Sequence, residues 1–334
     1  VSEVFVAGRD HGLVPIGEGT LGQPHATSLR MGRLGYQSDA QASLAVSYNC
    51  LESYAASLHD ALTRPYPAYE AVGVRDAQGG YRQLATTLLQ IENEFYSTIR
   101  PKRVVRSGER PLHALRERGV EYVEVRCMDL DPFEPAGIGA ETARFLDAFL
   151  LHCLLADSPD DTPAEIAALA RNQQRTAAQG RDPALQLERG ADRVRLVDWA
   201  EELLEGMAPI AQALDHANAG SGGRAALELA RQRLRDPSLT PSARVLAEMA
   251  SDFGGSHRAF GLARSQATRR ALLARPLPAD AEAALRAMAR VSLDEQARRE
   301  AADAQQPFED FRRSYLDPAQ LVPEVAVASA PCRP

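Results

Sequence analysis

The part of the chain after about residue 140 follows a helical pattern of apolar and polar positions. Apolar side chains recur there at three- and four-residue spacings, and breaks that contain glycine or proline separate the runs. Each run is long enough for an ordinary globular helix. The pattern predicts helices over residues 142–156, 163–178, 194–218, 224–234, 241–251, 257–273 and 279–304.

The earlier part of the chain has a mixed pattern. One amphipathic helix is predicted to begin at Ser38 or Asp39, either of which can cap it, and to end before Pro65. Alternating segments then predict strands within residues 84–96 and 120–130. Strands followed by a run of helices indicate an α+β fold with an antiparallel sheet, because parallel sheets alternate strands with helices.

These patterns divide the chain into three parts. Residues 1–135 are predicted to form the sheet-containing part of one domain, and residues 136–316 its helical region. Residues 317–334 show no amphipathic period and are predicted to be a disordered tail. The chain opens at Val1 without a methionine and enters strand-like sequence at once, so we expect that a preceding segment is missing.

Composition narrows the class of protein. Of the 334 residues, 45% are hydrophobic and 25% charged, as in soluble globular proteins, and the net charge of -7 gives no general attraction to nucleic acid or membranes. The longest apolar stretch, residues 145–156, contains Asp147 and His152, so no membrane span is expected. Four scattered cysteines fit a reducing, cytoplasmic compartment.

The densest group of polar side chains lies in residues 90–96. On the predicted strand, Gln90, Glu92, Glu94 and Tyr96 would point to one face. Such a face either lines a ligand site or is simply exposed to solvent, and the pattern leaves both interpretations open.

A second group lies on the next predicted strand, where Tyr122, Glu124 and Arg126 share a face. A carboxylate that holds Mg²⁺ together with phosphates, beside an arginine that neutralises a transferring phosphoryl group, suits phosphate chemistry. The alternative is a structural ion pair between strands.

A third group is basic and comprises Arg100, Lys102, Arg103 and Arg106, of which Lys102 is the sole lysine of the chain. Such a run can hold a triphosphate or an RNA backbone, or it can be merely solvated. No aromatic residues alternate with these basic residues, which disfavours the RNA interpretation. The glycine-rich motifs of P-loop and Rossmann nucleotide sites are absent from the sequence.

Taken together and in this order, these segments resemble the glutamate–cysteine ligase family of proteobacterial type. The resemblance corresponds to the C-terminal two thirds of such proteins and covers nearly everything before the tail, with several long motifs in the right order. The matching stretches are residues 26–36, 89–109 and 121–133, with weaker similarity around residues 144–147, 180–181, 239–246 and 254–255.

The resemblance implies an enzyme with a glutamine-synthetase-like fold, in which an antiparallel sheet curls into a funnel. It implies that ATP phosphorylates the γ-carboxylate of L-glutamate, and that L-cysteine then attacks the γ-glutamyl phosphate, the first step of glutathione biosynthesis. It further implies Mg²⁺, or Mn²⁺ in its place, as cofactor. No nucleic-acid or membrane partner is expected, and the protein is expected to be a monomer.

Residue roles follow from the same resemblance. Arg30 corresponds to the group that binds the cysteine carboxylate, and Tyr36 and Tyr96 line the same pocket. Glu124 corresponds to a Mg²⁺ ligand, and Arg126 to the catalytic arginine that binds phosphate and stabilises the transferring phosphoryl group.

Two further residues, Lys102 and Arg103, correspond to groups that help to hold ATP. Family members carry an earlier segment that supplies most metal-binding carboxylates and a metal-binding histidine, so this chain alone is expected to be an incomplete enzyme. The alternative is a noncatalytic fragment that binds amino acids or a partner protein.

Overall fold

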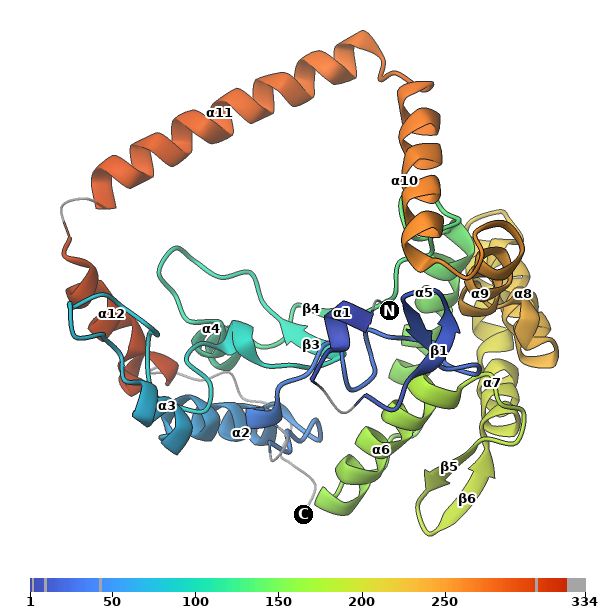
Figure 1. Cartoon of the computed structure of the whole chain (residues 1–334). Coiled ribbons are helices and arrows are strands. Elements are labelled where there is room, and N and C mark those ends of the chain that lie inside the picture. Colours follow the sequence, from blue (N-terminus) through green and yellow to red (C-terminus); the bar gives the residue numbers. More distant parts are fainter. Residues whose placement is uncertain (2, 9–10, 42–43, 304–305, 323–334) are drawn as a thin grey trace. The chain divides into compact units, whose positions relative to one another are not determined.

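The computed structural model describes residues 1, 3–8, 11–41, 44–303 and 306–322. These residues form two compact units, each built from two stretches of the chain (Figure 1). Unit 1 comprises Val1–Gln37 and Cys127–Leu273, and unit 2 comprises Ser38–Arg126 and Ala274–Pro334. The predicted boundary at residue 135 falls inside unit 1, and the predicted division into a sheet part and a helical part stays a prediction.

Unit 1 is mainly helical, with two antiparallel strand pairs, β1 with β2 and β5 with β6. Its elements are α1 (Glu3–Val6), β1 (Val14–Gly17), β2 (Thr20–Gly22), α5 (Ala140–Leu155), α6 (Pro163–Gln179), β5 (Gln186–Arg189), β6 (Asp192–Arg195), α7 (Leu196–Ala217), α8 (Gly222–Arg235), the 3-10 turn Pro237–Leu239, α9 (Pro241–Asp252) and α10 (His257–Leu273).

The main core cluster of unit 1 lies where α5, α7 and α8 pack together. Ala148, Met207 and Ala211 are fully buried there, and such small side chains let helices approach closely. Asp215 near the end of α7 accepts a hydrogen bond of 2.6 Å from the backbone N–H of Gly223 at the start of α8. The antiparallel packing of α7 and α8 is therefore fixed at their connection.

The seven helices predicted after residue 140 are confirmed, with ends that differ by at most two residues. The β5–β6 hairpin between α6 and α7 was not predicted. Its turn contains Gly190 at φ +61°, and the side-chain amide of Asn172 on α6 bonds both the N–H and the C=O of Glu188. Packing on α6 thus supports strands that are too short and polar to be recognised from sequence.

In its described residues, unit 2 combines helices with one antiparallel strand pair, β3 with β4. Its elements are the 3-10 turn Asp39–Gln41, α2 (Leu51–Thr63), α3 (Pro67–Val72), the 3-10 turn Glu92–Glu94, β3 (Ile99–Lys102), α4 (Pro111–Arg118), β4 (Tyr122–Val125), α11 (Ala279–Asp303), α12 (Phe308–Leu316) and the 3-10 turn Pro318–Leu321. With both units described, the α+β class predicted from sequence is confirmed. Among the described residues, none of the helices is both long and apolar enough to cross a membrane.

The core of unit 2 forms around α2 and α4. Ala55 and Ala61 of α2 pack with Leu89, Leu112 and Leu321, and each of these residues is at most 1% exposed. Part of the predicted disordered tail is therefore ordered, because the turn Pro318–Leu321 places an apolar side chain in this core. Residues 323–334, also assigned to that tail, lie outside the described residues.

The helix predicted from Ser38 or Asp39 begins later, at Leu51. Cys50 has an extended backbone, and its side chain and that of Ser53 exchange hydrogen bonds with each other's N–H groups in a capping box. The helical spacing of apolar residues before this cap was misleading, because residues such as Val46 reach the core from irregular backbone.

The strand predicted within residues 84–96 is wrong. Gln90 Oε1 accepts hydrogen bonds from the backbone N–H of Leu84 and Ala85, and Gln90 N–H donates to Glu94. These side-chain bonds replace a strand ladder and lead into the turn Glu92–Glu94. The polar side chains that were predicted to share one face of a strand instead form hydrogen bonds with nearby backbone groups and stabilise a turn.

Candidate functional site

The antiparallel pair β3–β4 gathers charged side chains on one face. Its register places Arg100 opposite Glu124 and Lys102 opposite Tyr122, and alternate residues of a strand point to the same side. The backbone N–H of Arg126 donates a hydrogen bond of 2.7 Å to the carbonyl of Thr98, so the pairing continues one residue past β4. The residues on this charged face are Arg100, Lys102, Tyr122, Glu124 and Arg126.

The carboxylate of Glu124 lies between two cations on this face. Its Oε2 is 3.3 Å from Lys102 Nζ and 4.0 Å from Arg126 Nη1. The same oxygen is buried and accepts no hydrogen bond from the residues that the structure describes. The predicted grouping of Tyr122, Glu124 and Arg126 is confirmed, and so is the ion pair between strands that the sequence left open.

With the cations of Lys102 and Arg126 beside one carboxylate, the charged face suits the oxygens of a phosphate chain, whereas Arg100 is buried and bonds the segment before β3. To serve as a ligand for Mg²⁺, Glu124 Oε2 would have to exchange its ion pair with Lys102 for the metal ion. Mg²⁺ requires about six oxygen ligands, and Lys102 and Arg126 repel a bare divalent ion. Phosphate oxygens and water would have to complete such a site.

The remaining basic residues of this segment are paired with glutamates. Arg103 Nε lies 3.6 Å from Glu121, and Arg106 Nη1 lies 3.7 Å from Glu117. The predicted basic run therefore separates into Arg100 and Lys102 on the charged face, and two arginines in ion pairs with other carboxylates.

A second group of metal-ligating side chains lies near α4. One ligand atom each of Glu109, His113 and Glu117 falls within 4.8 Å of the others. The guanidinium of Arg118 forms bonds of 2.7 Å to both carboxylate oxygens of Glu109 and also contacts Glu117. An internal cation thus already neutralises these carboxylates.

Arg30 and Tyr36 come together in a tight turn of unit 1. Tyr36 N–H donates to the carbonyl of Arg30 at 2.6 Å, and the Arg30 guanidinium carbon lies 5.7 Å from the Tyr36 ring centroid. A side chain at Gly35 would collide with the Arg30 backbone, so glycine permits this turn. Arg30 is exposed and Tyr36 half-buried, which suits a guanidinium that binds a small carboxylate.

The chain just before this turn is anchored on α6. Thr27 N–H donates to Ala177 O at 2.9 Å, and Thr27 Oγ1 donates to Thr176 O at 2.7 Å. Arg181 Nη2 donates to Pro24 O at 2.6 Å. These hydrogen bonds hold the residues that precede the Arg30 turn against α6 and the residues that follow it.

Tyr96, the other predicted cysteine-binding tyrosine, belongs to unit 2 and follows the turn Glu92–Glu94. Its side chain is 39% exposed. Its expected neighbour on a common strand face, Glu92, is 7% exposed and pairs with Arg110 instead. Glu92 is therefore structural rather than part of a ligand-lined face.

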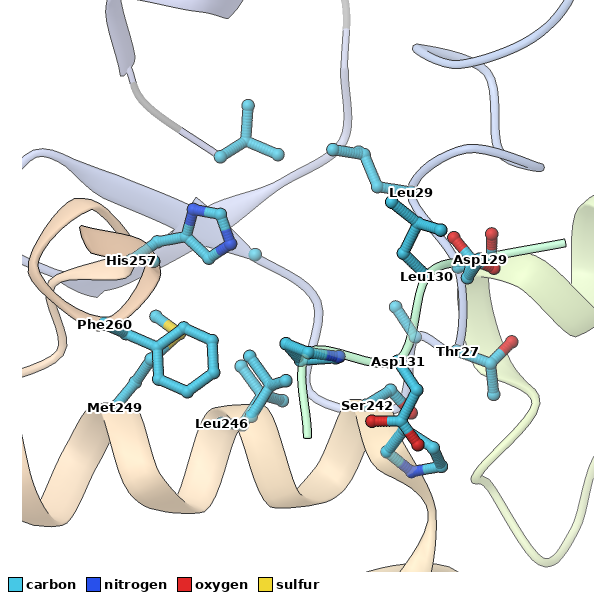
Figure 2. A pocket seen from close by; sticks show the side chains of 18 of the residues that line it. Thr27, Leu29, Asp129, Leu130, Asp131, Ser242, Leu246, Met249, His257 and Phe260 are labelled. Carbon is cyan, nitrogen blue, oxygen red and sulfur yellow. The ribbon is translucent and has the colours of Figure 1, made fainter. Parts of the chain in front are cut away.

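A large cavity of about 1200 Å³ lies within unit 1 and was not predicted from sequence (Figure 2). Most of its lining is apolar, and Figure 2 shows Leu246, Met249 and Phe260 at its wall, with Asp129 nearby. Burial lowers the pKa of His257 in the same wall, which favours its neutral form. None of the residues predicted for substrate, nucleotide or metal lines this cavity.

The sequence held only a weak signal for this cavity. Its walls come from Val1 and from segments around residues 11–34, 129–137, 174–178 and 241–273, which are far apart in the chain. Residues 129–133 belong to a stretch of family resemblance for which the sequence predicts no role.

The fold and the charged face define an α+β protein with a surface suited to phosphate groups. The family model for glutamate–cysteine ligase matches residues 1–176, which is more than half of the 334 residues. The chain belongs to the glutamate–cysteine ligase family.

Relatives and a solved structure agree with this assignment. The glutamate–cysteine ligase of Janthinobacterium sp. (strain Marseille) is 49% identical over 316 residues, which cover 94% of this chain and 59% of that protein. That of Azotobacter vinelandii is 49% identical over 311 residues, covering 93% and 58%. The chain thus spans about three fifths of the length of these curated relatives.

The crystal structure of the Francisella tularensis glutamate–cysteine ligase in complex with AMP superimposes with a TM-score of 0.86 at 33% identity, and the match covers 96% of this chain and 62% of that one. A bifunctional glutathione synthetase from Pasteurella multocida matches with a TM-score of 0.54 at 22% identity, which indicates a related fold alone.

Proposed function

We propose that this chain forms part of the catalytic site of an ATP-dependent ligase that joins L-cysteine to the γ-carboxylate of L-glutamate. The observation that carries the proposal is the charged face of β3–β4, which sets Lys102 and Arg126 around Glu124 in a chain of this family. The relatives are named for this reaction, and AMP in the Francisella structure supports the use of a nucleotide.

The reaction has two steps. A γ-carboxylate oxygen of glutamate attacks the γ-phosphorus of ATP, and the bond to ADP breaks. The neutral amine of cysteine then attacks the acyl carbon of the γ-glutamyl phosphate and releases one N–H proton to solvent. The new C–N bond forms as inorganic phosphate leaves.

The charged face serves the first step. Arg126 and Lys102 place fixed positive charge beside the transferring phosphoryl group, whose charge spreads over its oxygens. Glu124 would hold Mg²⁺, or Mn²⁺, which when bound neutralises phosphate charge. Arg103 assists with the nucleotide when its guanidinium turns from Glu121.

The cysteine is bound by other groups. The exposed Arg30 guanidinium offers two parallel N–H donors to the cysteine carboxylate, and Tyr36 lies against it. Tyr96 is the unit 2 residue proposed for the same substrate. A bound carboxylate leaves the amine of cysteine available for attack.

The proposal also covers the sheet around the site, the oligomeric state and the cellular location. We place β3–β4 in a glutamine-synthetase-like sheet that curls into a funnel around the substrates. We further propose a monomer in the cytoplasm, which size-exclusion chromatography and cell fractionation test directly.

The experiment is ATP-dependent formation of γ-glutamylcysteine from glutamate, cysteine and Mg²⁺. It uses the purified chain and, beside it, a chimera that joins the chain to the part of the Janthinobacterium ligase that the match does not cover. Activity in either form that Arg126→Ala removes supports the proposal. Folded proteins without activity in both forms contradict it and favour a noncatalytic fragment that binds amino acids or a partner.

A further inference from the structure

The segment that carries Tyr96 is held by one glutamine side chain from the start of unit 2. Gln41 Oε1 accepts a hydrogen bond of 3.0 Å from the backbone N–H of Tyr96, and Gln41 Nε2 donates one of 2.8 Å to the carbonyl of Glu94. One amide group thus grips two backbone positions of this segment. Since Gln41 is more than fifty residues away in the chain, these bonds fix tertiary structure rather than a local turn.

A buried arginine holds the same segment at its ends. Arg100 is 5% exposed, donates through Nη2 to Asn93 O at 3.2 Å, and donates through Nε to Ser97 Oγ at 3.3 Å. Its guanidinium carbon lies 5.9 Å from the Phe95 ring centroid. Burying a guanidinium is costly without such partners, so this arginine stays with the segment.

Arg100 also belongs to β3, directly opposite Glu124. It therefore connects the Tyr96 segment to the strand pair that carries the charged face. Tyr96 is 39% exposed, so packing in the core is not enough to fix its position.

We propose that Gln41 and Arg100 are positioning residues that hold Tyr96 at a fixed place relative to Glu124, so that bound cysteine meets the acyl phosphate in the right geometry. This inference rests on the proposed function, which assigns Tyr96 to cysteine and Glu124 to the phosphoryl group. If Tyr96 shifts, its side chain loses contact with cysteine, so loss of these two backbone hydrogen bonds weakens cysteine binding.

The test uses Gln41→Leu, which keeps the bulk of the side chain but removes both hydrogen bonds. The expected result is a rise of about tenfold to 100-fold in the KM for cysteine, with the KM for ATP unchanged. Amide hydrogen exchange, followed by NMR, should show loss of protection at the Tyr96 N–H. Gln41→Glu keeps the acceptor for that N–H and should restore most of the cysteine affinity.

Gln83→Leu is the matched control. Gln83 lies in unit 2 and donates through Nε2 to the backbone carbonyl of Tyr69 at 2.6 Å, a residue outside the 93–97 segment. Its loss should leave the KM for cysteine unchanged. Arg100→Gln is the second variant and should raise the KM for cysteine in the same direction.

A Tyr96 amide that stays protected in Gln41→Leu overturns the inference, and so does a lost protection with unchanged KM for cysteine. If neither the chain nor the chimera makes γ-glutamylcysteine although the Tyr96 amide is protected, the proposed function fails and the inference fails with it. The amide measurement thus separates failure of the positioning contacts from failure of the function.

Discussion

Glu92 and Arg110 form a buried ion pair in which Arg110 Nη2 lies 2.9 Å from Glu92 Oε2 and the side chains are 7% and 2% exposed. The backbone N–H of Leu112 donates to the same carboxylate at 3.2 Å, and Arg110 Nη1 donates to Tyr315 O at 2.6 Å. The pair therefore joins the Glu92–Glu94 turn, the start of α4 and the end of α12 within unit 2.

Removing one member of this pair should destabilise the protein strongly. Glu92→Leu or Arg110→Met leaves a buried charge without a partner, and the expected loss is about 3–5 kcal/mol in the free energy of unfolding. Urea denaturation measures it. Arg64→Ala is the control, because the Arg64–Asp60 pair is exposed and should contribute less than about 1 kcal/mol.

The double variant Glu92→Leu with Arg110→Met distinguishes the cost of an unpaired buried charge from the cost of altered packing. It should recover part of the loss, since no buried charge remains unpaired. If each single variant costs no more free energy of unfolding than Arg64→Ala, the buried pair does not stabilise unit 2.

The helices after residue 140 were predictable because their cores depend on local spacing. Ala148, Met207 and Leu227 lie on the inner faces of α5, α7 and α8. Apolar residues on such a face repeat with a period of about 3.6 residues, which can be recognised in the sequence without knowledge of tertiary contacts. The glycine and proline breaks fixed the ends.

Residues 84–96 were not predictable from spacing. Gln90 and Glu92 look like members of one strand face, but their partners are backbone groups around Leu84 and the distant Arg110. A pattern of period two does not reveal whether a polar side chain meets a ligand, water or a buried arginine. The β4 face was predicted correctly because a ladder with β3 enforces the alternation of Glu124 and Arg126.

Arg30→Ala should separate cysteine use from ATP use in whichever form of the protein is active. Loss of a charged hydrogen-bond donor to the cysteine carboxylate costs about 1.5–3 kcal/mol, or about tenfold to 150-fold in the KM for cysteine. The KM for ATP should stay unchanged. Arg33→Ala, three residues along the same turn, is the control, and equal losses for both substrates count against the role of Arg30.

Arg126→Ala should lower the turnover number, since its charge is proposed to act on the transferring phosphoryl group. Removing one such preorganised donor slows a reaction by about 100-fold to 1000-fold. Steady-state kinetics at saturating substrates measures the effect, with Arg64→Ala as the exposed control. An unchanged turnover number in a folded Arg126→Ala protein would exclude this role.

Acid should destabilise the two units through two different glutamates. Hydrogen bonds from Arg118 lower the pKa of Glu109 in unit 2 to about 2, and those from Arg171 lower the pKa of Glu188 in unit 1 to about 2. A carboxylate whose pKa is depressed by folding stabilises the fold above its unfolded pKa of about 4.3, and this contribution disappears as pH falls toward 2.

Thermal melting between pH 6 and pH 2.5 tests this dependence. Stability should decrease below about pH 4.3, and Glu109→Gln and Glu188→Gln should each lower the melting temperature at pH 6 while flattening its fall in acid. Asp60→Asn, in an exposed pair, is the control and should leave the slope unchanged. Because the pKa of each glutamate depends on its own arginine, the two effects should add in the double variant. If neither substitution reduces the slope of melting temperature against pH, other carboxylates cause the acid sensitivity.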